Sequence, residues 1–254
     1  MNDIDVAVEA AHAAGALLQH YEDGPRQIHH KGAIDLVTEV DLACEQSIRD
    51  VLTSHTPEIP ILGEEQGGSR DAPTTWIVDP LDGTTNYVHG FPYYGVSIAL
   101  RRNHQLVVGV VYDPVRDKTY RAQMGAGAWC NDRPMSVSHC PDLSSALVGT
   151  GFAYDRRERS AFYLRYFEPV LKRVRGVRRA GAAAMDLAMV ADGRLDAYWE
   201  FGLQPWDVAA GIVLVREAGG RVTGHDGTDI APTLESPLAT NGLLHAPMQA
   251  LLIP

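Results

Sequence analysis

The sequence predicts a mixed α+β and α/β protein, with helices packed over a sheet in its first half and alternating strands and helices in its second half. Apolar residues recur at helical spacing near the N-terminus, whereas residues 94–121 consist of short apolar runs separated by turn residues. We therefore expect residues 1–141 to form an α+β lobe and residues 142–254 to form an α/β lobe, the two packed as one compact unit.

The first lobe is expected to begin with two helices. Asp3–Tyr21 carries small and apolar residues along one face, and a second helix is expected from about Glu39 to Leu52. Five apolar runs predict strands, and two further segments continue in extended form: Ile59–Leu62, Trp76–Val78, Val96–Leu100, Leu106–Tyr112, Thr119–Ala122, then Gly125–Cys130 and Met135–Ser138. The turn residues between the later runs favour an antiparallel sheet.

The second lobe is expected to begin at Pro141-Asp142, where turn residues separate the two halves. Its predicted elements alternate between strand and helix: Ala146–Thr150, Glu158–Val174, Ala182–Ala191, Leu195–Phe201 and Trp206–Ala218. This alternation is typical of an α/β arrangement.

Composition narrows the class of protein. The 254 residues carry a formal net charge of −10, which argues against broad electrostatic binding to nucleic acid. Cys44, Cys130 and Cys140 lack metal-site spacing, so we expect reduced thiols. No targeting segment and no apolar run of membrane-spanning length is evident. A soluble cytoplasmic protein is therefore expected.

An acidic segment follows the predicted strand Trp76–Val78. Asp79 and Asp82 lie three residues apart in what Pro80 and Gly83 mark as a tight turn. Two carboxylates so close repel unless a cation lies between them, and oxygen ligands suit Mg²⁺. The following Gly83-Thr84-Thr85 is expected to begin a short helix whose free N–H groups face an anion. Asp, Pro and Gly are also ordinary turn formers, so this segment alone leaves both interpretations open.

Other acidic residues are candidates for the same site. Glu64 follows a predicted strand and Gly63, which favours a position in a cleft. Asp207 lies in the first turn of a predicted helix, where it either complements the helix dipole or adds a third carboxylate. Asp41 has the spacing of a helix cap, and Lys31 could be a solvated charge. The basic cluster Lys172–Arg179 is interpreted as a solvated helix end rather than an RNA-binding patch.

Several of these segments together resemble the inositol monophosphatase family. The motifs that carry the resemblance are Gly63-Glu64-Glu65, Asp79-Pro80-Leu81-Asp82-Gly83-Thr84-Thr85-Asn86, Trp206-Asp207-Val208-Ala209-Ala210-Gly211 and Glu217-Ala218-Gly219-Gly220. The resemblance covers nearly the whole chain. It implies a layered αβαβα sandwich of the inositol monophosphatase and fructose-1,6-bisphosphatase type. It also implies a homodimer that hydrolyses phosphate monoesters with Mg²⁺, for which Mn²⁺ can substitute, and that Li⁺ inhibits.

The resemblance further implies roles for single residues. A first Mg²⁺ would be held by Glu64, Asp79 and the carbonyl of Leu81, a second by Asp79, Asp82 and Asp207, and a weaker third by Glu64 and, through water, Glu65. The catalytic residues would be Glu64, Thr84 and Asp82, with Thr84 orienting the attacking water. Phosphate would contact Gly83, Thr84 and Thr85. The substrate would contact Asp82, Gly181, Ala182, Ala183, Glu200 and Asp207. Lys31 and Asp41 would support the site.

The implied substrate is inositol 1-phosphate. The chain departs from relatives at Gln204, where a basic residue is common, and at Ala182, where Thr or Ser is common. Fructose 1,6-bisphosphate, histidinol phosphate and 3′-phosphoadenylate therefore remain alternatives. Glu200 followed by Phe201 favours a polyol, since the sequence shows no aromatic clamp for a base. A non-catalytic role with RNA or the transcription machinery rests only on residues 173–179.

Overall fold

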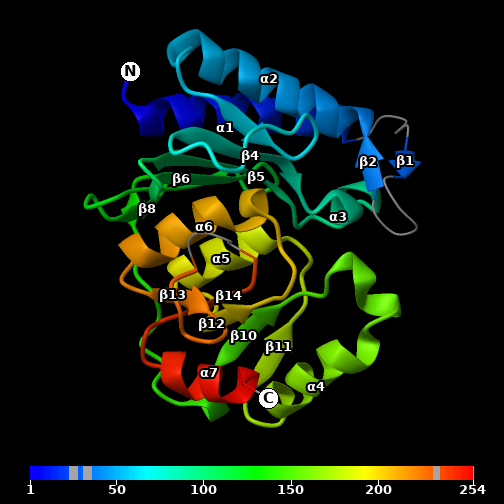
Figure 1. Cartoon of the computed structure of the whole chain (residues 1–254), viewed down its shortest axis with the longest axis vertical. Coiled ribbons are helices and arrows are strands. Elements are labelled where there is room, and N and C mark those ends of the chain that lie inside the picture. The colour runs from blue at the N-terminus through cyan, green and yellow to red at the C-terminus, as the bar shows by residue number, and fades with distance from the viewer. Residues whose placement is uncertain (23–27, 31–35, 231–234, 254) are drawn as a thin grey trace.

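The structure is a computed structural model of the chain and describes residues 1–22, 28–30, 36–230 and 235–253. Its helices and sheets lie in five successive layers, which Figure 1 shows from top to bottom as helices, sheet, helices, sheet and helices. The predicted layered αβαβα fold is thus confirmed. The described part of the chain contains no helix with the length and apolarity needed to cross a membrane.

The first two layers are built from the first half of the chain. Helices α1 (Asp3–Tyr21) and α2 (Glu39–His55) pack against each other over a seven-stranded sheet. Its strands, in spatial order, are β3 (Ile61–Gly63), β4 (Thr75–Asp82), β5 (Gly95–Arg102), β6 (Gln105–Asp113), β7 (Lys118–Gln123), β8 (Ala128–Cys130) and β9 (Arg133–Pro134). Only β3 and β4 pair in parallel, so the predicted antiparallel region is confirmed. Strands β1 (Ile28–His30) and β2 (Leu36–Thr38) form a separate pair.

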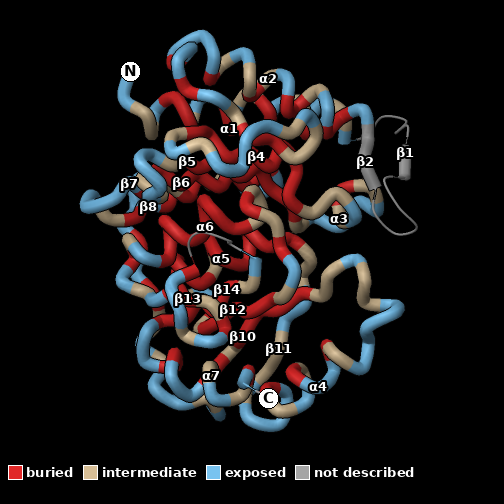
Figure 2. The backbone as a smooth tube through the Cα atoms, in the orientation of Figure 1, coloured by how far each residue is buried: buried red, intermediate tan, exposed pale blue. Residues whose placement is uncertain are grey.

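Strand β4 is buried along its whole length because helices cover both faces of the sheet. Trp76 and Val78 face the core beneath α1 and α2, whereas Ile77 faces the core on the other side. This alternation follows from the two-residue repeat of a strand. Figure 2 shows the central strands and the middle helices as the most continuously buried part of the molecule. The segment that carries Asp79 and Asp82 therefore leaves a rigid, doubly covered strand.

The middle layer consists of α5 (Ala183–Ala191) and α6 (Pro205–Glu217), which lie between the two sheets. The two helices approach closely at Gly211, where a Cβ atom would collide with the side chain of Leu187. Gly211 thus lets the middles of α5 and α6 pack closely against each other.

The last two layers come from the second half of the chain. The second sheet has the strand order β11 (Gly176–Arg178), β10 (Leu147–Thr150), β12 (Ala197–Trp199), β14 (Pro237–Thr240) and β13 (Arg221–Gly224). Helices α4 (Ser160–Leu171) and α7 (His245–Leu252) cover its outer face around a third core. The sequence did not predict β11, β13, β14 or α7, and α4 ends three residues earlier than expected.

Candidate active site

Strand β4 and the helix that follows it place the central acidic residues. The prediction that Asp79 and Asp82 lie in a tight turn is wrong, because β4 continues through Asp82. Asp79 pairs with Ser97 and Asp82 with Gly95, so the register shifts between them and forms a bulge. Pro80 has no N–H for the ladder, and a bulge accommodates it. The predicted short helix is confirmed: α3 (Thr84–Val88) begins after Gly83, whose φ is 96°.

Asp82 caps a helix that is a hundred residues away in the sequence. Its carboxylate accepts hydrogen bonds from the backbone N–H groups of Ala183 (2.9 Å) and Met185 (3.1 Å) at the start of α5. The residue before that helix, Ala182, offers no side-chain acceptor of its own. Because the first N–H groups of a helix lack internal partners, the carboxylate and the dipole stabilise each other. This contact brings the α5 start against β4.

Asp207 serves the start of α6 in the same way. Its Oδ2 accepts a hydrogen bond from the Gln204 N–H at 2.7 Å and completes a capping box. The Gln204 side chain in turn accepts a hydrogen bond of 2.7 Å from Arg70, whose guanidinium lies 5.1 Å from the centre of the Trp206 ring. The dipole interpretation of Asp207 therefore describes its local role, and Asp207 also lines the cavity described next.

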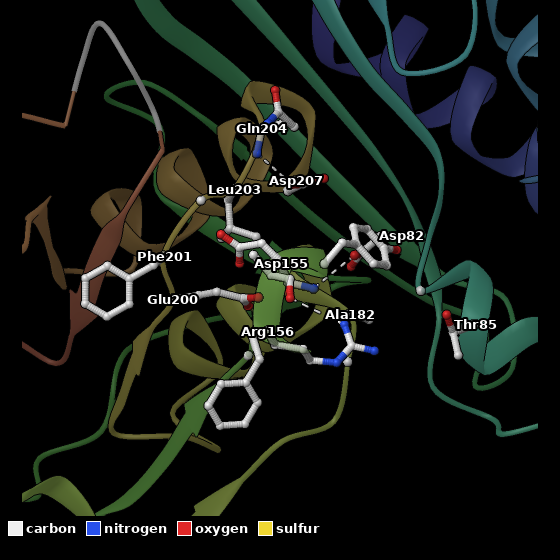
Figure 3. A pocket seen from close by; sticks show the side chains of 18 of the residues that line it. Asp82, Thr85, Asp155, Arg156, Ala182, Glu200, Phe201, Leu203, Gln204 and Asp207 are labelled. Atoms are coloured by element: carbon white, nitrogen blue, oxygen red, sulfur yellow. Dashed lines mark hydrogen bonds between the residues drawn. The ribbon is translucent and has the colours of Figure 1, made fainter. Parts of the chain in front are cut away.

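These segments surround one cavity of about 780 Å³. Its described lining includes most of the predicted site residues: Glu64, Asp79, Leu81, Asp82, Gly83, Thr84, Thr85, Gly181, Ala182, Ala183, Glu200 and Asp207. Figure 3 shows Asp207 above Glu200 in this view, with Asp82 beside Ala182. Glu65 and Asp41 are not among the lining residues, and Lys31 lies outside the described residues.

Like charges meet in this cavity. Burial raises the pKa of Asp79 well above its usual value, and the nearby charges of Glu64, Asp82 and Asp207 raise it further. Burial likewise raises the pKa of Asp82 to about 8, although the N–H groups of α5 oppose this shift. Crowded, desolvated carboxylates are unfavourable unless protons or cations offset their charge.

The oxygen donors fit a hard divalent cation in their chemistry and in their placement around one cavity. As the side chains stand, no three His, Cys, Asp or Glu residues within the described ranges are close enough to hold an ion. Asp82 and Asp207 are instead oriented by backbone N–H groups at two helix starts. These contacts orient both carboxylates at the cavity.

Thr84 lines the cavity and contacts the buried carboxylate of Asp41, which is not a lining residue. The Thr84 hydroxyl lies 3.0 Å from Asp41 Oδ1 and 3.2 Å from the Leu81 carbonyl, so it can donate its hydrogen to either. Asp41 is buried in α2. A hydroxyl that donates to a carboxylate keeps its lone pairs for a further donor. Thr84 can therefore accept a hydrogen bond from a molecule in the cavity.

A buried glutamate that the sequence analysis did not identify holds the Glu64 loop. Glu45 lies in α2 and accepts hydrogen bonds from the N–H groups of Glu65 (2.7 Å) and Gln66 (3.0 Å). Arg49 pairs with the same carboxylate at 2.8 Å. A Cβ atom at Gly63 would collide with this carboxylate. The sequence did contain a signal for this ion pair: Glu45 lies beside the apolar stripe of the predicted helix, and Arg49 follows four residues later.

Two further groups of cavity residues were also missed. Arg156, Arg159 and Arg179 line the cavity, which the sequence did not predict. Arg179 is also exposed, so the solvated interpretation of the basic cluster holds for it. Helix α4 ends before the cluster, and β11 then carries the chain back toward the α5 start. The lining also contains six aromatic residues, although the sequence showed no aromatic clamp for a base: Phe152, Tyr154, Phe162, Tyr163, Phe201 and Trp206. Phe162 and Phe201 contact each other edge-on, which makes this wall apolar.

The fold and the acidic cavity place the protein among phosphatases with metal-dependent catalysis. The model of the Inositol monophosphatase family matches residues 2–253, and the chain belongs to that family. It is 45% identical to an inositol-1-monophosphatase of Synechocystis over 95% of this chain and 85% of the relative. It is 43% identical to a protein named Nus factor SuhB of Pseudomonas aeruginosa, over 89% of this chain and 86% of the relative.

A solved structure shares the fold almost completely. The extragenic suppressor protein suhB of Bartonella henselae matches with a TM-score of 0.93 and 39% identity, over 98% of this chain and 97% of the other. Family membership thus establishes that the protein is a phosphatase that acts on small phosphate monoesters.

Proposed function

We propose that the protein hydrolyses inositol 1-phosphate to inositol and phosphate, with Mg²⁺ as the cofactor and water as the nucleophile. The observation that carries this proposal is the gathering of four carboxylates beside the α3 start in one cavity. Phosphate monoesters hydrolyse very slowly without catalysis, so stabilisation of charge must supply most of the rate. A cavity that combines acidic ligands with unpaired helix-start N–H groups meets that need.

All of the proposed ligands except Glu65 belong to the described lining. Glu64, Asp79 and the Leu81 carbonyl would hold one Mg²⁺, and Asp79, Asp82 and Asp207 a second. Glu64, with Glu65 through water, would hold a weaker third. When bound, these ions lower the pKa of a coordinated water and stabilise charge on the departing oxygen. Mn²⁺, which also favours oxygen ligands, is expected to substitute.

The residues of the chain supply orientation and proton transfer. Thr84, supported by its hydrogen bond with Asp41, accepts a hydrogen bond from the attacking water, and Glu64 takes up its proton. The N–H groups of Gly83, Thr84 and Thr85 bind phosphoryl oxygens. The Asp82–Ala183 contact fixes the α5 start against which the inositol ring rests. Glu200 and Gly181–Ala183 then contact the ring hydroxyls.

A phosphate-release panel tests the substrate. The wild-type protein is assayed with inositol 1-phosphate, fructose 1,6-bisphosphate, histidinol phosphate and 3′-phosphoadenylate, each with and without Mg²⁺. The proposal predicts the highest kcat/KM for inositol 1-phosphate and release only with Mg²⁺. The other three compounds would be hydrolysed by the same chemistry. A higher kcat/KM for one of them would show that it, rather than inositol 1-phosphate, is the preferred substrate. Equal release without divalent cations would contradict the mechanism.

The proposal also covers the location of the protein, its oligomeric state and its inhibition. We propose a cytoplasmic homodimer that Li⁺ inhibits, which light scattering and a Li⁺ titration of turnover can check.

A transcription-associated role is the second candidate. Two relatives at 43% and 41% identity carry the name Nus factor SuhB. The favouring observation here is the exposed basic group Lys172, Arg173, Arg175 and Arg178. Binding of a single-stranded RNA that is lost on neutralising these four residues, with turnover unchanged, would support it.

A further inference from the structure

Strand β12 brings a tyrosine and a glutamate together at the cavity wall. Side chains alternate along a strand: Ala197 and Trp199 belong to the outer core beneath α4 and α7, whereas Tyr198 belongs to the core around α5 and α6. Glu200 follows two residues later and therefore lies on the same side as Tyr198. The Tyr198 hydroxyl donates a hydrogen bond of 2.5 Å to Glu200 Oε2. Both residues are buried, but only Glu200 lines the cavity.

The neighbouring strand β10 confines the same carboxyl group. Strands β10 and β12 pair in parallel, and Thr150 stands opposite Trp199. The next residue, Gly151, therefore lies beside Glu200, and a Cβ atom at Gly151 would lie only 1.9 Å from Glu200 Oε2. The carboxyl group thus fills the space that a side chain at this position would need. A hydrogen bond from Tyr198 and the backbone of Gly151 together hold Glu200 Oε2 in place.

The other oxygen of Glu200 remains available to a molecule in the cavity. In the part of the chain that the structure describes, Oε1 has no hydrogen-bond partner. Figure 3 shows the Glu200 side chain between Asp207 and Arg156 in this view of the cavity. An ionised carboxylate accepts hydrogen bonds and donates none. The group that fits Oε1 is therefore a hydroxyl of the substrate.

We propose that Tyr198 is a positioning residue that acts through Glu200. By holding Oε2, it directs Oε1 at one hydroxyl of the substrate, so that the enzyme prefers phosphate monoesters that carry this hydroxyl. The inference rests on the proposed function and names the residue that sets its selectivity for hydroxylated substrates. A hydroxyl that donates to a carboxylate makes a strong, directional hydrogen bond. A site built for such a bond rejects an analogue without the hydroxyl, because the buried acceptor is then left unpaired.

The alternative is that Tyr198 only fills the core, where a Cβ atom at Gly149 would lie 3.1 Å from its ring. A packing role would affect all substrates alike, so a paired comparison separates the two. Inositol 1-phosphate and cyclohexyl phosphate share a ring and a phosphate and differ in the ring hydroxyls. Tyr198→Phe keeps the aromatic ring and removes only the hydroxyl. Tyr112→Phe is the matched control, since Tyr112 is buried, donates a hydrogen bond of 3.0 Å to Asp117 and does not line the cavity.

The proposal predicts a loss that depends on the substrate. Light scattering and thermal unfolding first confirm that both variants keep the wild-type mass and fold. Tyr198→Phe should lower kcat/KM for inositol 1-phosphate about tenfold and for cyclohexyl phosphate less than twofold, with the Ki of cyclohexyl phosphate used where its turnover is too slow. Tyr112→Phe should change neither value. Equal losses on the two compounds, or no loss on either, would overturn the proposal.

The pH profile gives a readout that packing would not move. Burial raises the pKa of Glu200 to about 7, and the hydrogen bond from Tyr198 opposes this rise. Without the hydroxyl, the pKa of Glu200 should rise further. The acid limb of kcat/KM for inositol 1-phosphate should then move up by about one pH unit in Tyr198→Phe, whereas the profile for cyclohexyl phosphate should not move. An unmoved limb would contradict the proposal. The other charged or titratable groups that face Glu200 are Arg156 and Arg179, which also lower its pKa, and Asp186 and Tyr163.

Failure of the proposed function has a different signature. The wild-type protein would then release no phosphate from inositol 1-phosphate. In that case, calorimetry with the same two compounds in the presence of Mg²⁺ still decides the role of Tyr198. Tighter binding of inositol 1-phosphate than of cyclohexyl phosphate, lost in Tyr198→Phe but kept in Tyr112→Phe, supports it. Equal or absent binding of both compounds by the wild-type protein refutes it.

Discussion

Replacing Glu45 tests whether the Glu64 loop is held from behind by a buried carboxylate. Glu45→Ala removes the acceptor of two backbone N–H groups and leaves the partly buried Arg49 without its ion-pair partner. Removing one member of a buried, hydrogen-bonded ion pair costs about 3–5 kcal/mol. Glu45→Gln keeps one acceptor oxygen and the side-chain shape, so we expect a smaller cost of about 1–3 kcal/mol. Both figures refer to the free energy of unfolding.

The assay is urea unfolding combined with phosphate release. Glu39→Ala, at an exposed position of the same helix, is the matched control and should lose less than about 1 kcal/mol. Because Glu64 follows Gly63 in the loop that Glu45 binds, we also expect Glu45→Gln to lower kcat at least tenfold. A Glu45→Ala protein that matches the wild type within about 0.5 kcal/mol and retains full turnover would refute the reasoning.

Two more predictions concern the substrate wall and the middle layer. Burial raises the pKa of Glu200 from 4.5 to about 7, so the folded protein binds more protons than the unfolded chain between these values and loses stability as pH rises through them. Relative to wild type, Glu200→Gln should therefore gain up to about 3 kcal/mol in unfolding free energy from pH 4.5 to 8, measured by urea unfolding at each pH; a pH-independent difference would contradict this. Gly211→Ala should destabilise the protein by about 1–2 kcal/mol, because the collision with Leu187 outweighs the gain in helix propensity, and a raised Tm would show that α5 and α6 can separate at little cost.

Local patterns predicted the parts of the fold that depend on local sequence. The helix Asp3–Tyr21 has a clear apolar face and was predicted with its observed bounds. Strand β4 was predicted too short, because Pro80 and Gly83 normally end a strand. Helices on both faces of the sheet stabilise β4 as far as its last residue, Asp82, and a bulge accommodates Pro80. That support comes from residues far away in the sequence and leaves no local signal.

In the candidate site, too, residues in local motifs were predicted, whereas residues placed by long-range contacts were not. Acidic residues in short motifs pointed to Glu64, Asp79, Asp82 and Asp207, and the structure places all four at one cavity, although their roles remain predictions. The place of Arg179 at the cavity was not predicted, because it depends on the return of β11 toward the α5 start, whereas its exposure agrees with the prediction. Positions set by chain topology are invisible to composition and spacing.

The most direct test of the central claim is the Mg²⁺ dependence of phosphate release in Asp82→Asn. The asparagine keeps an oxygen that can accept the Ala183 N–H, so the α5 start and the fold should survive, as a wild-type Tm would show. We predict that release from inositol 1-phosphate falls at least about 100-fold at every Mg²⁺ concentration. A folded Asp82→Asn protein that releases phosphate at near the wild-type rate would show that these carboxylates do not form the catalytic metal site.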